Sequence, residues 1–233
     1  MFKPGPLYER RKEILKLLQE VPLQTGDIVY SASNATGPLS IPFGSLIQTF
    51  TKSPYSHATL ILCESDEIYV IDVSDWGTRK LRVVDWFDNW GTTDFCVVRL
   101  VDIDETMSGC LTDSINAFLR DDPRYDFNFD DVNAYYCTEA VAAMLGRCGV
   151  DLGGAFLIKD IVPSWFYPLL VAGSWLTKVL TNSSLPTDRP IHIVGNEKKG
   201  MLASEKTKMI FEYDGQTDTC LRFLSDSFSE YEI

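Results

Sequence analysis

Two apolar segments joined by a short polar stretch constrain the fold more than any other part of the sequence. Residues 58–63 are mostly apolar, residues 64–67 read Glu-Ser-Asp-Glu, and a second apolar segment covers residues 68–74. This pattern predicts a β-hairpin. If the turn contains two or four residues, strand alternation places His57 and Asp72 on one face, directly opposite each other or one diagonal apart.

Histidine is scarce in this chain, so there are few candidates for a general base near neutral pH. The sequence contains only His57 and His192. A carboxylate beside His57 would fix its tautomer and stabilise the imidazolium, as the third member of a Cys-His-acid site does. Taken alone, His57 is equally consistent with a hydrogen-bonded structural histidine. His192 lies in the run 190–194, where a half-buried strand histidine is the simpler interpretation.

Cys137 begins a stretch with the pattern of an amphipathic helix. Apolar residues recur after it at helical spacing, alanines favour a helix, and Gly149 supplies a stop. In a first turn, free backbone amides and the helix dipole stabilise a thiolate, which is the nucleophilic form of cysteine. For this stretch alone, a buried and inert cysteine is the more common outcome. The hairpin upstream is what favours a nucleophile.

Two tyrosines and one acid lie close to these candidates in the sequence. Tyr55 precedes His57 by two residues, and Tyr136 directly precedes Cys137. Either hydroxyl is a candidate donor to an oxyanion. Tyrosines beside turns more often pack their ring against the protein and expose the hydroxyl to water. The backbone amide of Cys137 is the safer donor. We interpret Glu139 as structural, because a first-turn acid favours the helix end but would oppose a nearby thiolate.

The acidic composition argues against some classes of partner. The chain has 233 residues, 45% of them hydrophobic, so it can bury a sizeable core as one large domain. Its net charge of −12 argues against nucleic acid or an anionic membrane surface as the main partner. Residues 1–20 contain no uninterrupted apolar run, so we expect cytoplasmic synthesis without a signal peptide. Export by a signal-independent route is left open.

No metal or cofactor motif is recognisable. The six cysteines show neither the CxxC pairs of a zinc site nor the density of a disulfide scaffold, so we expect reduced thiols. Asp126, Asn128 and Asp130 alternate as in a calcium loop, but Asp131 stands where glycine is expected and no glutamate closes the set. The sequence therefore predicts no metal site and no cofactor.

Residues 161–177 have the least ordinary composition. They contain no charged residue and several large aromatic ones. The segment is slightly short for a membrane span and contains two prolines, so we do not expect a transmembrane helix. A hydrophobic lid or extra core layer is the simpler interpretation, and an apolar surface for an acyl chain or a partner is the alternative. We expect the segment to pack beside the mouth of the Cys137 cleft.

The order of these motifs resembles that of a known enzyme family. Five stretches carry the resemblance: residues 26–29 (GDIV), 53–57 (SPYSH), Asp72, 125–127 (YDF) and 136–139 (YCTE). They look like the circularly permuted papain-like hydrolases, the YiiX/YaeF-like amidases of the NlpC-type cell-wall peptidase superfamily, which are related to lecithin:retinol acyltransferase-like proteins. In that branch the histidine strand precedes the cysteine helix, as it does here. The resemblance covers about residues 26–150 and extends toward residue 163.

The resemblance implies a role for each of three polar residues. It implies Cys137 as the nucleophile, His57 as the base and Asp72 as the orienting acid. The family frequently has glutamate in the third place and serine after the cysteine, so Asp72 and Thr138 are conservative departures. We expect the Cys137 sulfur within roughly 4 Å of one His57 ring nitrogen, with an Asp72 oxygen at the other.

These features together predict the architecture. We expect an α+β, permuted papain-like (NlpC-type) fold, in which a small antiparallel sheet packs against the helix that carries Cys137. We expect a single catalytic domain over residues 1–233. Its expected parts are a core at about 21–160, a hydrophobic insertion or lid at 155–180 and a C-terminal extension at 181–233.

The predicted activity is that of a cysteine hydrolase that cleaves an amide bond through an acyl-enzyme. Resemblance alone favours a peptidoglycan stem peptide, or another peptide, as the substrate. A lipid acyl hydrolase or acyltransferase on the same fold, and a catalytically silent binding module, remain as alternatives. The expected partners are a peptide, peptidoglycan or lipid-like substrate, without nucleic acid, and a protein inhibitor or chaperone is left open.

Overall fold

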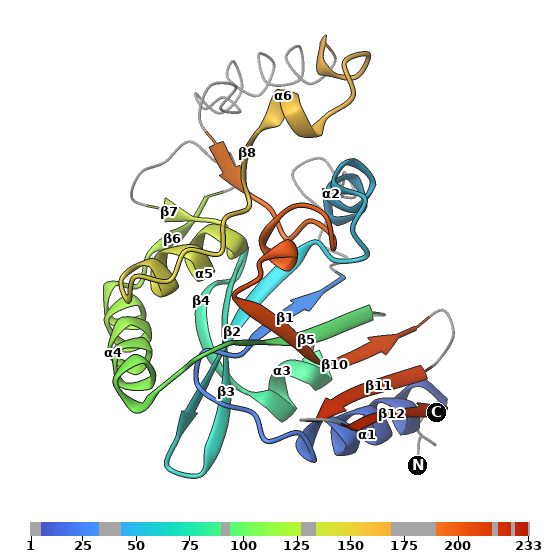
Figure 1. Cartoon of the computed structure of the whole chain (residues 1–233), viewed down its shortest axis with the longest axis vertical. Helices are drawn as coiled ribbons and strands as arrows, with labels where there is room; N and C mark the ends of the chain where they lie inside the picture. Colours follow the sequence, from blue (N-terminus) through green and yellow to red (C-terminus); the bar gives the residue numbers. More distant parts are fainter. Residues whose placement is uncertain are drawn as a thin grey trace.

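An antiparallel sheet of eight strands forms the centre of the structure, in the order β12-β11-β10-β5-β1-β2-β3-β4 (Figure 1). This computed structural model describes residues 6–32, 43–89, 94–126, 134–168, 190–215, 219–224 and 227–232. The sheet strands are β1 (Ile28–Ser31), β2 (His57–Glu64), β3 (Glu67–Ser74), β4 (Gly77–Arg82), β5 (Asp94–Leu100), β10 (Thr207–Asp214), β11 (Thr219–Leu224) and β12 (Ser227–Glu232). The predicted α+β class is confirmed.

Helices and two small ribbons surround this sheet. The helices are α1 (Pro6–Gln19), α2 (Phe43–Thr51), α3 (Val83–Asn89), α4 (Glu105–Asp121), α5 (Cys137–Gly146) and α6 (Ile158–Ile161), with a 3₁₀ turn η2 (Met201–Ala203). The ribbons pair β6 (Arg124–Tyr125) with β7 (Ala134–Tyr135) and β8 (Ala155–Leu157) with β9 (Pro190–His192).

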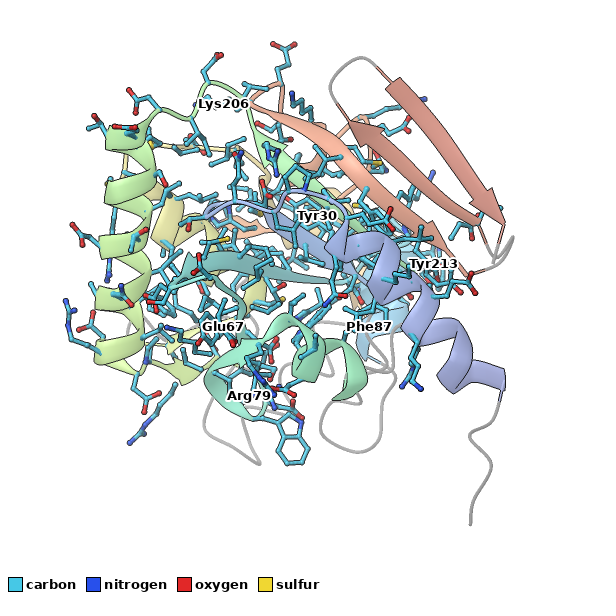
Figure 2. All side chains as sticks on the ribbon, turned by 90° about the horizontal axis from the view of Figure 1, so that it is seen from below. Tyr30, Glu67, Arg79, Phe87, Lys206 and Tyr213 are labelled. Atoms are coloured by element: carbon cyan, nitrogen blue, oxygen red, sulfur yellow. A yellow bond between two sulfur atoms is a disulfide. The ribbon has the colours of Figure 1, made fainter. Side chains whose placement is uncertain are left out.

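Each face of the sheet packs against its own helices. Leu60 points into a buried cluster that includes residues of α4 and α5. Its neighbour Ile61 points to the other face, into a cluster with α1 and α3, as strand alternation requires. Figure 2 shows Phe87 and Tyr213 of this second cluster close to α1. The sheet is therefore the middle of three layers.

The β2–β3 hairpin has a two-residue turn. Ser65 and Asp66 form it, and both have positive φ, 49° and 66°. Two consecutive positive φ angles are typical of a type I′ turn, whose twist matches that of the flanking strands. Continuing the register beyond the Leu60–Ile71 pair places His57 one diagonal from Asp72 on the same face. The alternation expected from the sequence is confirmed.

A disulfide joins the two helices on one face of the sheet. It links Cys110 of α4 to Cys148, just beyond the end of α5. The expectation of reduced thiols is therefore wrong for this pair, because helix packing brings together two cysteines that lie 38 residues apart. Cys63, Cys96 and Cys137 are free.

The C-terminal strands enlarge the sheet beyond the small one expected. β10 pairs with β5 from Thr207–Leu100 to Asp214–Asp94, with an irregularity between Met209 and Phe211. Phe211 is fully buried in the cluster that also contains α1 and α3. Strands β11 and β12 then continue the sheet to its edge.

The described part of the hydrophobic segment follows β8. Val162 is buried, whereas the Trp165 side chain is 72% exposed. The Phe166 ring lies 4.8 Å, between centroids, from the ring of Phe50 in α2. Figure 1 shows α6 and α2 at the same end of the molecule as the ribbon of β8 and β9. Within the described ranges, no helix is long and apolar enough to cross a membrane.

Candidate active site

Cys137 is the first residue of α5, and Tyr136 is the N-cap of that helix. The cysteine is buried, with 7% of its surface exposed. The backbone amides of Ala58 and Thr138 donate hydrogen bonds to its sulfur. Amides from the helix start and from β2 therefore converge on one atom, which favours the ionised thiol.

His57, the first residue of β2, contacts both of its expected partners. Its Nε2 lies 2.7 Å from Oδ1 of Asp72. Its ring also forms a hydrogen bond with the Cys137 thiol. Because Asp72 occupies Nε2, the nitrogen left for the thiol is Nδ1. All three side chains are buried, with exposed fractions of 4% for His57 and 0% for Asp72.

Burial and mutual charge act in opposite directions on this pair. Burial alone would lower the pKa of His57, but the charge of Cys137 and hydrogen bonds to Asp72 and Cys137 raise it to about 10. For the Cys137 thiol the directions are reversed, because burial would raise its pKa whereas the charge and the hydrogen bond of His57 lower it. The arrangement therefore favours a thiolate beside an imidazolium at neutral pH.

Asp72 has further partners that sequence analysis missed. Its Oδ2 accepts hydrogen bonds from the Ser74 hydroxyl at 3.1 Å and from Arg79 Nη2 at 2.5 Å. Burial would raise the pKa of Asp72, but the bonds and charges of His57 and Arg79 lower it. Alternation along β3 places Ser74 on the face of Asp72, whereas Arg79 could be found only from the register of β4.

The two candidate oxyanion tyrosines have other partners. The Tyr55 hydroxyl donates to Glu212 of β10 at 2.7 Å. The Tyr136 hydroxyl accepts a hydrogen bond from the backbone amide of His192 at 2.5 Å. The Tyr55 proton is therefore used by Glu212, whereas the Tyr136 hydroxyl accepts in its bond and keeps its own proton to donate. Their role as oxyanion donors stays a prediction.

Residues on both sides of Cys137 hold the strand β9. The Tyr136 hydroxyl accepts from the His192 amide, and the Thr138 hydroxyl donates to the His192 carbonyl at 2.8 Å. His192 is half-buried in a strand, as expected. These bonds fix the ribbon of β8 and β9 at the start of α5. Residues 158–168, which include the described start of the hydrophobic segment, therefore follow a ribbon that is held beside the candidate nucleophile.

Tyr125 is a further residue near the thiol. Burial raises its pKa well above the ordinary value, and the charges of Cys137, Asp75 and Asp72 add to the effect. The phenol therefore stays protonated near these groups. Sequence analysis used Tyr125 only as part of the family resemblance, because no pattern showed that β6 pairs with the strand that leads into Cys137.

A match over most of the chain shows which protein family it belongs to. Residues 22–181 match the model of the permuted papain-like amidase enzymes, YaeF/YiiX, of the C92 family. The chain belongs to this family. The resemblance drawn from motif order is confirmed, and the match includes His57, Asp72 and Cys137. At the level of the family, this match supports a cysteine hydrolase of the amidase type. Among curated proteins, none matches the chain.

A solved structure shares the fold. It is the metalloprotein yiiX from Escherichia coli O157:H7, which is 20% identical, with a TM-score of 0.62. The likeness covers 80% of this chain and 96% of that one. At this identity it supports the permuted papain-like architecture and nothing finer.

That relative is described as a metalloprotein, which raises the question of metal ligands in the present chain. Among its described residues, no three His, Cys, Asp or Glu side chains are grouped as metal ligands would be. The alternation that starts at Asp126 continues into residues 127–133, which lie outside the described ranges. The described side chains do not fit a metal site, and the chemistry derived below uses only the chain's own groups.

Proposed function

We propose that this amidase-family protein hydrolyses an amide bond in a peptide, with Cys137 as nucleophile, His57 as acid and base, and Asp72 as the orienting acid. The contact that supports this most is the continuous chain from the Cys137 thiol through His57 to Asp72 Oδ1, which lies 2.7 Å from Nε2. A nucleophile bonded to a base that is itself held by a third group is the arrangement that acyl transfer requires.

Acylation begins with attack of the Cys137 thiolate on the carbonyl carbon of the amide. The resulting oxyanion needs hydrogen-bond donors. Cys137 is the first residue of α5, so its own amide has no acceptor within the helix and is the proposed donor. The carbon–nitrogen bond then breaks, and His57 transfers its Nδ1 proton to the departing amine. A thioester remains on Cys137.

Deacylation uses the same residues in the reverse direction. His57, now neutral, accepts a proton from a water molecule that attacks the thioester carbonyl. Collapse of the second tetrahedral intermediate releases the acid and restores the thiolate beside the imidazolium. Asp72 keeps Nε2 protonated and oriented throughout, because its Oδ1 remains the acceptor for that nitrogen.

The substrate class proposed is a peptidoglycan stem peptide, by analogy with the wider enzyme class. One observation favours a lipid acyl bond as the second candidate. Trp165 is 72% exposed and lies beside Phe166, which contacts Phe50 of α2. An exposed tryptophan in a segment that follows the ribbon held at the start of α5 suits an acyl chain as well as a peptide side chain.

Mass analysis of two substrates separates these candidates. Purified peptidoglycan and phospholipid vesicles are each incubated with the wild type and with Cys137→Ala. The proposal expects new peptide fragments only with peptidoglycan and only with the wild type. For each bond cleaved, the masses of the two products should sum to the mass of the intact peptide plus one water. Release of fatty acid that depends on Cys137 would favour the lipid candidate. Unchanged substrates in both incubations would favour a silent binding module.

A further inference from the structure

Arg79 holds Asp72 from the side away from His57. The two residues are direct cross-strand partners in the β3–β4 pair. Arg79 Nη2 donates to Oδ2 of Asp72 at 2.5 Å and lies 3.4 Å from the hydroxyl of Ser74. The Ser74 hydroxyl donates to the same carboxylate oxygen at 3.1 Å. Oδ1 is left for His57, so the two carboxylate oxygens have separate partners.

The Arg79 guanidinium has few partners besides Asp72. Within the described part of the chain, the Arg79 guanidinium has no hydrogen-bond acceptor other than Asp72 and Ser74. The Asp72 side chain is fully buried, whereas that of Arg79 is 32% exposed. The carboxylate can therefore turn away from His57 only if Arg79 and Ser74 release Oδ2.

We propose that Arg79 is a positioning residue of the reaction, which fixes the Asp72 carboxylate with Oδ1 turned toward His57 and balances its charge. Its hydrogen bonds go to Asp72 and Ser74 and not to the thiol. This inference rests on the proposed roles of Cys137 and His57. Nothing in the motif pattern assigned a role to Arg79.

The charge of Arg79 has a chemical consequence for His57. A buried carboxylate whose only cationic partner is the imidazolium would hold the His57 proton tightly. Arg79 supplies a second positive charge to Asp72, so His57 is freer to give its proton to a leaving amine. The same charge adds to the positive potential at the Cys137 thiolate, although at longer range.

Other titratable groups surround this cluster, and they define what a pH experiment must hold constant. Tyr125 of β6 is affected by the charges of Asp72 and of three further groups, which are Cys137 of α5, Asp75 of the turn between β3 and β4, and Asp126. None of these groups changes in the variants below. A displaced pH profile therefore reports the loss of the Arg79 charge.

The test is the pH dependence of Cys137 alkylation by iodoacetamide, with the modified peptide quantified by mass spectrometry. This readout needs no substrate. Arg79→Gln keeps a hydrogen-bond donor, on a shorter side chain, but removes the charge, so the thiolate loses stabilisation. The rising limb of the profile should move to higher pH by about 0.5 unit or more. Arg79→Lys, which keeps the charge, should restore the limb to within about 0.2 unit of the wild type.

Arg82→Gln is the matched control. Arg82 lies on the same strand, but it is 53% exposed and pairs with Asp85, so its removal changes the net charge equally without touching Asp72. Its profile should superpose on that of the wild type. An Arg79→Gln limb at the wild-type position, or an equal displacement in Arg82→Gln, overturns the proposal.

Two further outcomes keep the test decisive. If Arg79→Gln does not fold, the proposal is tested with Arg79→Lys alone. A rising limb of its alkylation profile that is displaced by about 0.5 pH unit, despite the retained charge, contradicts the proposal. The His57→Ala variant separates the two levels of the argument. If it leaves the Cys137 profile unchanged, the proposed function fails. If it changes the profile while the Arg79 variants do not, only the role of Arg79 fails.

Discussion

Asp72 shows how a single side chain links structure and reactivity in this protein. It is fully buried, with one oxygen on His57 and the other on Ser74 and Arg79. A buried carboxylate is tolerated only when such partners compensate the water that it has lost. The same partners hold the imidazole beside Cys137. Stability and the proposed chemistry therefore depend on one set of hydrogen bonds.

Replacing Asp72 by asparagine tests its proposed role. Asp72→Asn should lower kcat/KM on the substrate found in the peptidoglycan and lipid comparison by roughly 10²- to 10⁴-fold, because orientation and charge at His57 are lost while the nucleophile remains. Cys137→Ala and His57→Ala should abolish turnover. Thermal unfolding of all three variants is the control, since equal loss of folding would mark these residues as core elements instead.

Residue-level patterns predicted this site only in part. The alternation along the hairpin placed His57 and Asp72 together because a two-residue turn fixes the register. Arg79 was missed for the opposite reason. Sequence analysis gave it no strand, so nothing indicated that it lies across from Asp72. Residues 77–82 read GTRKLR and lack the apolar residues that marked the first hairpin, so local periodicity did not indicate β4.

At the level of secondary-structure elements, the ribbon of β8 and β9 connects the hydrophobic segment to the candidate site. His192 of β9 is bonded through its backbone to Tyr136 and Thr138, which flank Cys137. The described residues 158–168 follow β8 directly. Residues 169–177 lie outside the described ranges, so the position of the segment beside the nucleophile and its role as a lid stay predictions.

Trp165 allows a test of that prediction. Its side chain is 72% exposed, so Trp165→Ser should change the free energy of unfolding by less than about 0.5 kcal/mol. If the segment forms a substrate wall, KM should rise several-fold with little change in kcat. Trp76→Ser is the matched control, because Trp76 is 77% exposed and lies outside the segment. A large fall in melting temperature with unchanged kinetic constants would contradict the lid.

At the level of the whole molecule, the C-terminal strands are part of the central sheet. β10 pairs with β5, and Ile210 and Phe211 are buried in the core. The family match ends at residue 181, so these strands lie beyond it. The division of the chain into a single catalytic domain stays a prediction. Sequence analysis placed these residues only in a C-terminal extension, because long-range pairing with β5 has no local signature.

The disulfide provides a prediction about global stability. Cys110 and Cys148 close a loop with a sequence separation of 38 residues, and chain entropy alone would give the bond about 4 kcal/mol of stabilisation. Reduction should therefore lower the melting temperature by several degrees. Cys148→Ser should unfold at the temperature of the reduced wild type and should not respond to reductant. Identical melting curves with and without reductant for the wild type would contradict this account.

The central claim is that Cys137 exists as a thiolate paired with the His57 imidazolium. The most direct measurement is the rate of Cys137 alkylation as a function of pH, in the wild type and in His57→Ala. The pKa of Cys137 is lowered and that of His57 is raised to about 10, so alkylation of the wild type should already be fast at neutral pH. Without His57, burial should shift the rise above the ordinary thiol range. Wild-type alkylation that begins only in that range, with the same profile in His57→Ala, would contradict the claim.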